Sequence, residues 1–391
     1  MKRRLMLMLP MLHQGGFERV AVATARLLAD DYDVALCIFS DKNIHYDVSG
    51  LRIINLDVPS SKNRARKVFN VLLRIVRAHC VKRRERIDIT YSFGNTANPV
   101  NIFSRAGDRV ITGLRCGTDL ETPGIVRACV RRSDLVLSCS KEILALLKRD
   151  FACGGGAYLY NPLDVEDIRK KAAERQVKRE DGTFRIVTMG RDDVIKAHWH
   201  MIKAFYLVSR ELPEARLSVI GAGKYEAWRR LAEELGIAER VTFTGNLTDP
   251  FPEIDAADLY VLPSNREGFP NALLETMALG KPVIATDCRT GPREILLDDA
   301  ELEELLKKYP YGTSTAETVE GQYGILIPDM SDTPDPDPSH LSEERVLADT
   351  ILKMAQDTDY REKYAARAAK RAGDFCPGNY RKDLIRILEG V

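Results

Sequence analysis

The sequence predicts an α/β protein of two domains, each a parallel sheet with helices on both faces. The chain has 391 residues, enough for two domains of roughly 100–200 residues each. Short apolar segments alternate with amphipathic segments along most of it, which is typical of parallel sheets covered by helices. The alternation stops at the polar residues 161–182 and then starts again, so the chain contains two similar halves.

The first half alternates strand-like and helix-like segments. Residues 1–11 are basic and then apolar, as in a signal peptide, but the apolar run stops at Pro10 before a glycine-containing loop, which favours a strand. No segment reaches the ~18–20 uninterrupted apolar residues of a membrane span. We expect strands at 4–9, 33–39, 51–56, 87–92, 109–114 and 135–138, and helices at 17–29 and 66–84.

The second half repeats this pattern. Residues 328–340 are rich in proline and aspartate and predict a surface loop. Two such halves in tandem predict paired Rossmann-like domains that face a central cleft. We expect strands at 184–189, 216–220, 240–243, 259–262 and 282–285, and helices at 199–212, 224–235, 272–279, 293–297, 343–371 and 380–388.

The distribution of charge indicates what the protein can bind, and the cysteines indicate the compartment in which it works. Residues 1–160 carry 26 Lys and Arg against 15 Asp and Glu, a net charge of +11, whereas residues 161–391 carry −10. The basic half suits an anionic surface or substrate. The eight cysteines form no CxxC pair and no zinc-type spacing. Several lie in apolar runs, as Cys37 does, which predicts reduced core residues in a reducing compartment.

Residues 263–282 are the most informative stretch. They come directly after the expected strand 259–262, so they lie at a carboxyl edge of the sheet, where open α/β sheets bind ligands. The next helix begins near Asn271, and its N–H groups can hold a phosphate. Glu275 can accept hydrogen bonds from the vicinal hydroxyls of a ribose, and Glu267 from a sugar hydroxyl. Alternatively, both glutamates are solvated charges beside a helix.

The phrase Glu-Gly-Phe-Pro-Asn-Ala-Leu-Leu-Glu, from Glu267 to Glu275, resembles the Glu-x7-Glu motif of glycosyltransferase family 4. These are retaining enzymes of the GT-B fold. Residues 280–287 and 291–294 match the segments that come after that motif in the family. The resemblance covers nearly the whole chain and is most specific over 184–296. It implies a nucleotide diphosphate sugar donor, UDP-linked, held in part by Glu267, Gly268, Phe269, Pro270, Asn271 and Glu275.

Residues 189–196 resemble the Gly-Arg…Lys element of the same family, so Gly190, Arg191 and Lys196 are expected to hold the donor diphosphate. An arginine can bind phosphate bidentately and a lysine acts as a point charge. The alternative is two ordinary surface cations. Unlike the common Lys-Gly, this chain has Ala197 after the lysine. We interpret His198 and His200, the next two histidines, as helix-start or packing residues.

Three further segments carry weaker signals. Gly221-Ala-Gly223 lacks the third glycine of a dinucleotide-binding fingerprint. Thr244 and Gly245 resemble the family's segment beside the nucleotide base. Gly15 and Gly16 allow close backbone approach at a helix start, and they resemble the family's loop near the donor phosphates and the acceptor. The alternative for this pair is a simple turn.

One feature of the family is missing from the first half. Many relatives place a histidine near the transferred sugar after a later strand. Here Arg115-Cys-Gly-Thr118 comes after the strand 109–114. Arg115 therefore stands at that place, with Thr118 or Asp119 nearby, and His13 is a weaker candidate.

The segment 62–86 is basic, with apolar residues interleaved. A basic amphipathic helix can rest on anionic lipid, each cation contributing roughly 1 kcal/mol near the surface. The resemblance suggests an acceptor on a membrane lipid, such as an undecaprenyl-diphosphate-linked glycan. The alternatives are a solvated helix face and, with little support, nucleic-acid binding. We expect a cytoplasmic protein, peripheral at the inner face of the membrane.

The resemblance implies a retaining glycosyltransferase that moves a hexosyl or N-acetylhexosaminyl unit to a glycan or lipid-linked glycan in cell-surface polysaccharide synthesis. We expect Glu267, Arg191 and Lys196 to be catalytic, and no metal or cofactor. The resemblance implies domains at 1–163 (acceptor side) and 164–375 (nucleotide-sugar binding), with 376–391 returning to the first. The alternatives are a GT-B nucleotide-sugar epimerase and a non-catalytic nucleotide-sugar-binding subunit of a polysaccharide assembly complex.

Overall fold

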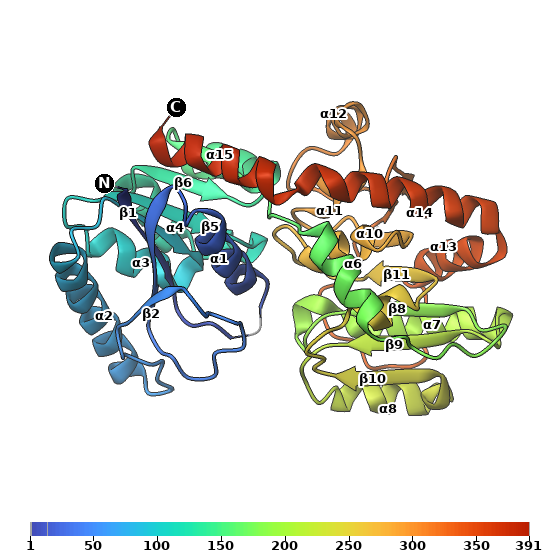
Figure 1. The fold of residues 1–391 in the computed structure, drawn as a ribbon. Coiled ribbons are helices and arrows are strands. Elements are labelled where there is room, and N and C mark those ends of the chain that lie inside the picture. Colours follow the sequence, from blue (N-terminus) through green and yellow to red (C-terminus); the bar gives the residue numbers. More distant parts are fainter. Residues whose placement is uncertain (1, 14, 391) are drawn as a thin grey trace. The chain divides into compact units, whose positions relative to one another are not determined.

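A computed structural model describes residues 2–13 and 15–390 (Figure 1). The chain divides into two units. Unit 1 consists of Met1–Pro162 and Pro377–Val391, and unit 2 of Leu163–Cys376. The C-terminal helix therefore belongs to the same unit as the N-terminal strands. Within the part of the chain that the structure describes, no helix combines the length and the apolarity that crossing a bilayer requires.

Unit 1 is a seven-stranded sheet in the order β3-β2-β1-β4-β5-β6-β7, with every neighbouring pair parallel. The strands are β1 (Arg3–Leu9), β2 (Tyr32–Ile38), β3 (Arg52–Asn55), β4 (Ile89–Phe93), β5 (Arg109–Leu114), β6 (Leu135–Ser138) and β7 (Gly156–Tyr158). The helices are α1 (Gly16–Leu27), α2 (Arg64–Arg84), α3 (Gly94–Phe103), α4 (Pro123–Arg132), α5 (Lys141–Phe151) and α15 (Pro377–Glu389).

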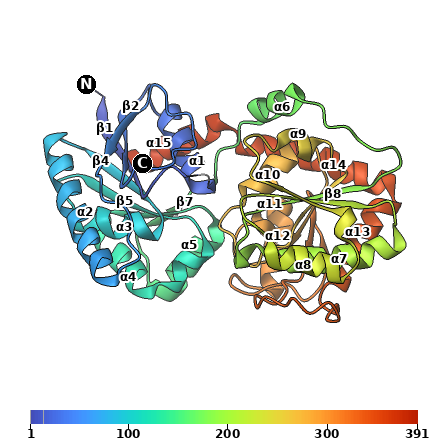
Figure 2. The ribbon, with the colours of Figure 1, turned by 90° about the horizontal axis from the view of Figure 1, so that it is seen from below.

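Both faces of this sheet are covered (Figure 2). Leu5, Leu7 and Leu9 of β1 pack in one apolar cluster with α1 and α15. Met6 and Met8 pack on the other face with α2 and α3. A strand buried on both faces needs apolar residues at every position, which is why β1 is continuously apolar rather than alternating.

Unit 2 has the strand order β10-β9-β8-β11-β12-β14-β13, parallel except for the β13–β14 pair. The strands are β8 (Arg185–Met189), β9 (Arg216–Ile220), β10 (Val241–Gly245), β11 (Leu259–Leu262), β12 (Val283–Thr286), β13 (Val319–Glu320) and β14 (Ile325–Ile327). The helices are α6 (Val165–Glu174), α7 (His198–Glu211), α8 (Glu226–Glu234), α9 (Phe251–Asp255), α10 (Asn271–Ala278), α11 (Pro292–Leu296), α12 (Asp299–Lys308), α13 (Arg345–Gln356) and α14 (Thr358–Ala372). Helices α7, α8 and α13 cover one face with a large apolar cluster, and α6, α9, α10 and α14 lie on the other (Figure 2).

The structure confirms the predicted class, two α/β units built on mainly parallel sheets. Two details differ. The helix expected at 343–371 is two helices, because Asp357 adopts an extended conformation and its carboxylate caps α14 by accepting from Tyr360 N–H. The polar segment 161–182 contains α6, which Asp164 caps by accepting from Asp167 N–H.

Candidate active site

Two loops at the carboxyl edge of the unit 2 sheet hold most of the predicted donor-binding residues. The β11–α10 loop spans residues 263–270, and the β8–α7 loop spans residues 190–197. Strands β8 and β11 are neighbours in the sheet. Parallel neighbours end at the same edge, so the two loops lie next to each other.

Glu267 and Glu275 are not solvated charges. Their exposed fractions are 7% and 4%, so the alternative of two surface carboxylates is wrong. Burial raises the pKa of Tyr260 on β11, and the negative charges of Glu267 and Glu275 add to the shift. Both carboxylates therefore lie within electrostatic reach of one side chain near the end of β11. Buried carboxylates require polar or charged partners, and such a pair suits ligand hydroxyls.

Lys196 supplies a partner for Glu267. Its Nζ lies 2.7 Å from Oε1 of Glu267. The two residues are 71 positions apart in the sequence, and the adjacency of β8 and β11 brings them together. The hydroxyl of Thr290 donates to the carbonyl oxygen of Glu267, so backbone and side chain of this glutamate are both fixed.

Arg191 differs from Lys196 in its surroundings. Its side chain is 62% exposed, and its ion-pair partner is Asp193, at 3.8 Å. Nε2 of His198 lies 3.0 Å from the carbonyl oxygen of Arg191, and the His198 ring meets Tyr225 edge-on at 5.3 Å. Burial lowers the pKa of His198, which favours the neutral ring. His198 therefore holds the loop backbone, and the guanidinium of Arg191 extends into solvent.

Gly221 and Gly223 have a packing role that the sequence did not reveal. Their φ angles are +152° and +147°, and a Cβ would lie 2.0 Å from Gly190 O and 2.1 Å from Asp192 Cβ, respectively. Only glycine fits such a close approach. The turn after β9 thus packs directly against residues 190–192 of the β8–α7 loop. Beside it, the N–H of Gly221 donates to the carbonyl oxygen of Gly245, which places Thr244 and Gly245 at the same edge.

The start of α10 has no side-chain cap; Pro270 occupies the N-cap position. Gly268, Phe269 and Asn271 surround this helix start. The ring of Phe269 is buried and packs edge-on against Phe375 at 5.4 Å. The loop before α10 is therefore anchored by an aromatic contact within unit 2.

Residues 291–294, which resemble a segment that comes after the Glu-x7-Glu motif in the family, have a structural role. Arg293 is buried and forms a two-point ion pair with Asp287, with Nε 2.9 Å from Oδ1. It also donates to the carbonyl oxygens of Tyr309 and Thr313. This residue fixes the chain after β12 and is not among the predicted site residues. Its signal in the sequence was only its place in the family phrase.

The glycine loop of unit 1 is fixed by Tyr46, which the sequence analysis did not single out. The Tyr46 hydroxyl donates to Gly15 O at 2.6 Å, and Gly15 N–H donates to the same hydroxyl oxygen at 2.9 Å. A Cβ on Gly15 would lie 2.2 Å from Oε2 of Glu18. Gly16 begins α1. His13 is half-buried, with its ring 5.9 Å from that of His45.

Arg115 is held inside unit 1. Its guanidinium donates to Oδ1 of Asn161 and to the hydroxyl of Tyr91, and it lies over the Phe93 ring. The side chain is buried. Thr118, in the short 3₁₀ turn after it, is partly exposed. Arg115 thus already has partners within its own unit, whereas Thr118 has an accessible side chain.

Within residues 2–13 and 15–390, no group of three His, Cys, Asp or Glu side chains could hold a metal ion. The positive charge that the β8–α7 loop presents comes from Arg191 and Lys196.

Comparisons with known proteins agree with this arrangement. A sequence profile described as Glycosyl transferases group 1 matches residues 183–308, which include both loops. An uncharacterized glycosyltransferase, MJ1059 of Methanocaldococcus jannaschii, is 31% identical over 59% of this chain and 57% of its own length. The N-acetylgalactosamine-N,N'-diacetylbacillosaminyl-diphospho-undecaprenol 4-alpha-N-acetylgalactosaminyltransferase of Campylobacter jejuni is 24% identical over 97% of both chains.

Solved structures share the fold over almost the whole chain. Anabaena HepE in complex with UDP and glucose aligns with a TM-score of 0.72 and 19% identity, covering 99% of both chains. Sucrose-phosphate synthase from Thermosynechococcus elongatus aligns with a TM-score of 0.75 and 15% identity, also over 99% of each chain. The chain is therefore a glycosyltransferase of the GT-B fold. It is a transferase enzyme.

Proposed function

We propose that this enzyme is a retaining, family 4 glycosyltransferase that moves a hexosyl or N-acetylhexosaminyl unit from a UDP-sugar to a glycan or lipid-linked glycan. The observation that carries the proposal is the Lys196–Glu267 pair, 2.7 Å apart beside the buried Glu275 at the carboxyl edge of the sheet. This edge is where open α/β sheets bind nucleotides. The exposed Arg191, on the same loop as Lys196, adds a second cation.

Each charged group has a task in this proposal. Lys196 and Arg191 bind the donor diphosphate, and the start of α10 at Phe269–Asn271 adds its N–H groups. Glu275 accepts hydrogen bonds from the ribose hydroxyls, and Glu267 from a hydroxyl of the transferred sugar. Thr244 and Gly245 lie beside the base. Lys196 then links the sugar-binding carboxylate to the diphosphate, because one ammonium can donate to both.

The chemistry derives from these positions. The bond between the anomeric carbon and the diphosphate oxygen breaks while the acceptor oxygen bonds to the same face of the sugar. The acceptor proton passes to the departing diphosphate oxygen. Negative charge grows on that diphosphate, and Lys196, Arg191 and the α10 dipole stabilise it where it develops. We assign no enzyme nucleophile, so configuration is retained by front-side displacement.

We assign His13 and Thr118 of unit 1 to acceptor binding, Gly15 and Gly16 to donor binding, and contact with an anionic membrane to α2. Val68, Phe69, Leu72 and Val76 on this helix are 58–61% exposed. Their spacing places them on one side of the helix. These are large apolar side chains in the open, on a helix with eight Lys and Arg and no acidic residue. Apolar insertion and attraction to anionic headgroups together favour peripheral binding.

The neighbouring helices strengthen the membrane assignment. Helix α3 packs against both α2 and α4, and neither α3 nor α4 contains Asp or Glu. Arg127, Arg131 and Arg132 of α4 surround a surface cavity of about 630 Å³. The charged residues of these three helices are therefore all basic and lie on α2 and α4, because α3 has no charged residue. Vesicle flotation tests the assignment: Leu72→Ser with Phe69→Ser should release the protein from anionic vesicles, and unchanged flotation would remove α2 from the proposal.

The donor assignment is tested by isothermal calorimetry against UDP, GDP, ADP and their sugars. UDP and one UDP-sugar should bind to the wild type, and Glu275→Ala should weaken both. Equal binding of all three diphosphates, or unchanged affinity of the variant, would contradict the assignment. The stereochemistry is tested by NMR of the anomeric proton of the product, where an inverted centre would exclude a retaining enzyme. An epimerase would release free sugar or epimer without any acceptor.

A further inference from the structure

The β14–α13 loop, residues 328–344, contacts the back of the β11–α10 loop through Ser331. The carbonyl oxygen of Ser331 lies 2.9 Å from Nε2 of His200 and accepts from Nδ2 of Asn265 at 3.2 Å. Its N–H donates to Oε2 of Glu343 at 2.8 Å. One backbone unit thus connects α7, the β11–α10 loop and the start of α13.

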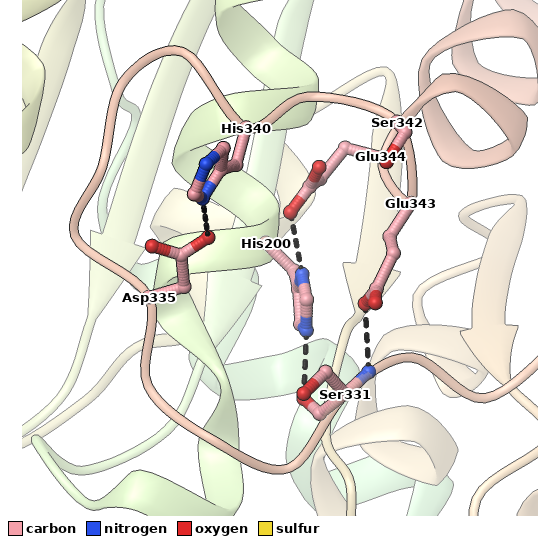
Figure 3. A pocket seen from close by; sticks show the side chains of 7 residues that line it. All are labelled: His200, Ser331, Asp335, His340, Ser342, Glu343 and Glu344. Atoms are coloured by element: carbon pink, nitrogen blue, oxygen red, sulfur yellow. Dashed lines mark hydrogen bonds and ion pairs between the residues drawn. The ribbon is translucent and has the colours of Figure 1, made fainter.

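His200 is bound on both sides of its ring (Figure 3). Nδ1 lies 2.7 Å from Oε1 of Glu344, and both side chains are buried. Each ring nitrogen of His200 therefore faces an oxygen atom of a different segment. A cavity of about 220 Å³ lies beside it, lined by His200, Ser331, Asp335, His340, Ser342, Glu343 and Glu344. His200 is therefore a buried side chain of α7 that connects this helix to the start of α13 and to the β14–α13 loop. His340, which lines the same cavity, is exposed.

Asn265 carries this contact to the two loops of the donor site. Its side chain donates to the carbonyl oxygens of Met330 and Ser331, at 3.0 and 3.2 Å. Its N–H donates to the carbonyl oxygen of Ile195 at 3.0 Å. Ile195 precedes Lys196, and Asn265 stands two residues before Glu267. A buried amide with these partners fixes the spacing of the Lys196–Glu267 pair, because a shift of Asn265 moves both loops.

We propose that His200 is a positioning residue for glycosyl transfer: acting through Ser331 and Asn265, it sets the Lys196–Glu267 pair that receives the donor. This inference rests on the donor site proposed above. His200 touches neither substrate nor the reacting atoms. A site built from pre-organised polar groups binds its ligand more weakly when the hydrogen bonds that support those groups are removed. Loss of His200 should therefore lower donor affinity as well as stability.

The middle of the same loop provides a control. Lys203 of α7 pairs with Asp335 at 2.9 Å, and His340 lies 3.1 Å from the same carboxylate. Neither Lys203 nor His340 bonds Ser331 in these contacts. Asp335→Asn and His340→Gln therefore loosen the loop without releasing the Ser331 contacts.

The experiment compares His200→Ala, His200→Gln and Glu343→Gln with the two control variants. Glu343 is exposed, so its variant folds even if the buried histidine proves indispensable. Hydrogen exchange of the peptide covering 263–271 measures how firmly the β11–α10 loop is held in the absence of donor. Calorimetry with UDP-sugar measures the affinity for the donor. Both are measured well below each variant's Tm.

We expect His200→Ala to speed exchange of this peptide and to weaken donor binding by roughly two- to thirtyfold. His200→Gln should partly restore both, because its amide can still donate to Ser331. Glu343→Gln should act in the same direction but less, and both controls should match the wild type. A lower Tm with wild-type exchange and affinity would overturn the proposal. If the wild type binds no nucleotide sugar, the proposed function fails, and exchange alone decides the role of His200.

Discussion

Replacing Lys196 with methionine tests the centre of the proposed site. The variant removes an ammonium 2.7 Å from the carboxylate of Glu267 while keeping a side chain of similar length. A hydrogen bond between charged groups contributes about 1.5–3 kcal/mol. Because the Lys196 side chain remains one-fifth exposed, we expect the lower part of that range, about 1.5–2 kcal/mol, to be lost from the free energy of unfolding.

The functional loss should be larger than the loss of stability. Removing one group that stabilises charge in the transition state typically costs about 10²–10³ in rate, so kcat/KM should fall by that factor. UDP affinity should fall too, because Lys196 is assigned to the diphosphate. Urea unfolding measures the first effect, and calorimetry with UDP and initial rates measure the second.

Lys281→Met is a matched control for this experiment. Lys281 is a similarly buried lysine of unit 2 with an ion pair to Asp255 at 3.2 Å, in the turn between α10 and β12, which carries no predicted donor residue. The control should change stability slightly and leave UDP affinity as it is. The reasoning would be refuted if Lys196→Met bound UDP as tightly as the wild type, or if both variants lost UDP affinity equally.

Three other perturbations give further checks. Arg191→Ala should weaken UDP binding without lowering the urea midpoint, since the side chain is largely exposed; a lower midpoint would show a structural role. Lys82→Met should lower the free energy of unfolding of unit 1 by about 3–5 kcal/mol, because it leaves Asp108, 2.8 Å away and equally buried, without its cation; a loss below about 1 kcal/mol would contradict this. Burial raises the pKa of Asp329 to about 6, above the ordinary value of about 3.9 for an unfolded chain. The ionised carboxylate therefore destabilises the folded protein; this destabilisation is absent below about pH 4 and grows as pH rises towards 6. Asp329→Asn should stabilise the protein at pH 7 but not at pH 4, and thermal unfolding at the two pH values measures the difference.

Local patterns predicted much of the fold. The apolar runs of β1 and β11 were readable because strands buried on both faces are apolar almost throughout. Helix α3 was not assigned. It contains Pro99, and its buried residues include Asn98 and Asn101, which donate to carbonyl oxygens of β4 and β5. Because polar residues occupy its buried face, the apolar periodicity that marks a helix is absent.

The family resemblance identified the donor-site residues, whereas only the structure revealed their geometry. The phrase around Glu267 and Glu275 identified them by resemblance, whereas periodicity left open whether they were solvated. Their burial results from the chain around them, including the strand β11 and the helix α10. The tie from His200 through Ser331 to Asn265 had no signal in the sequence, because it passes through a backbone carbonyl that every residue type supplies.

The sequence by itself determined the two α/β halves, the turns between strands and helices, and which residues carry charge near them. These depend on local preferences and on hydrophobic periodicity. Tertiary structure decided that Lys196 meets Glu267, that Gly221 and Gly223 support the β8–α7 loop, and that the guanidinium of Arg115 is already bound within unit 1. Those outcomes depend on which strands become neighbours in a sheet. Strand order is set by packing between segments far apart in the chain, and no local stretch of sequence contains it.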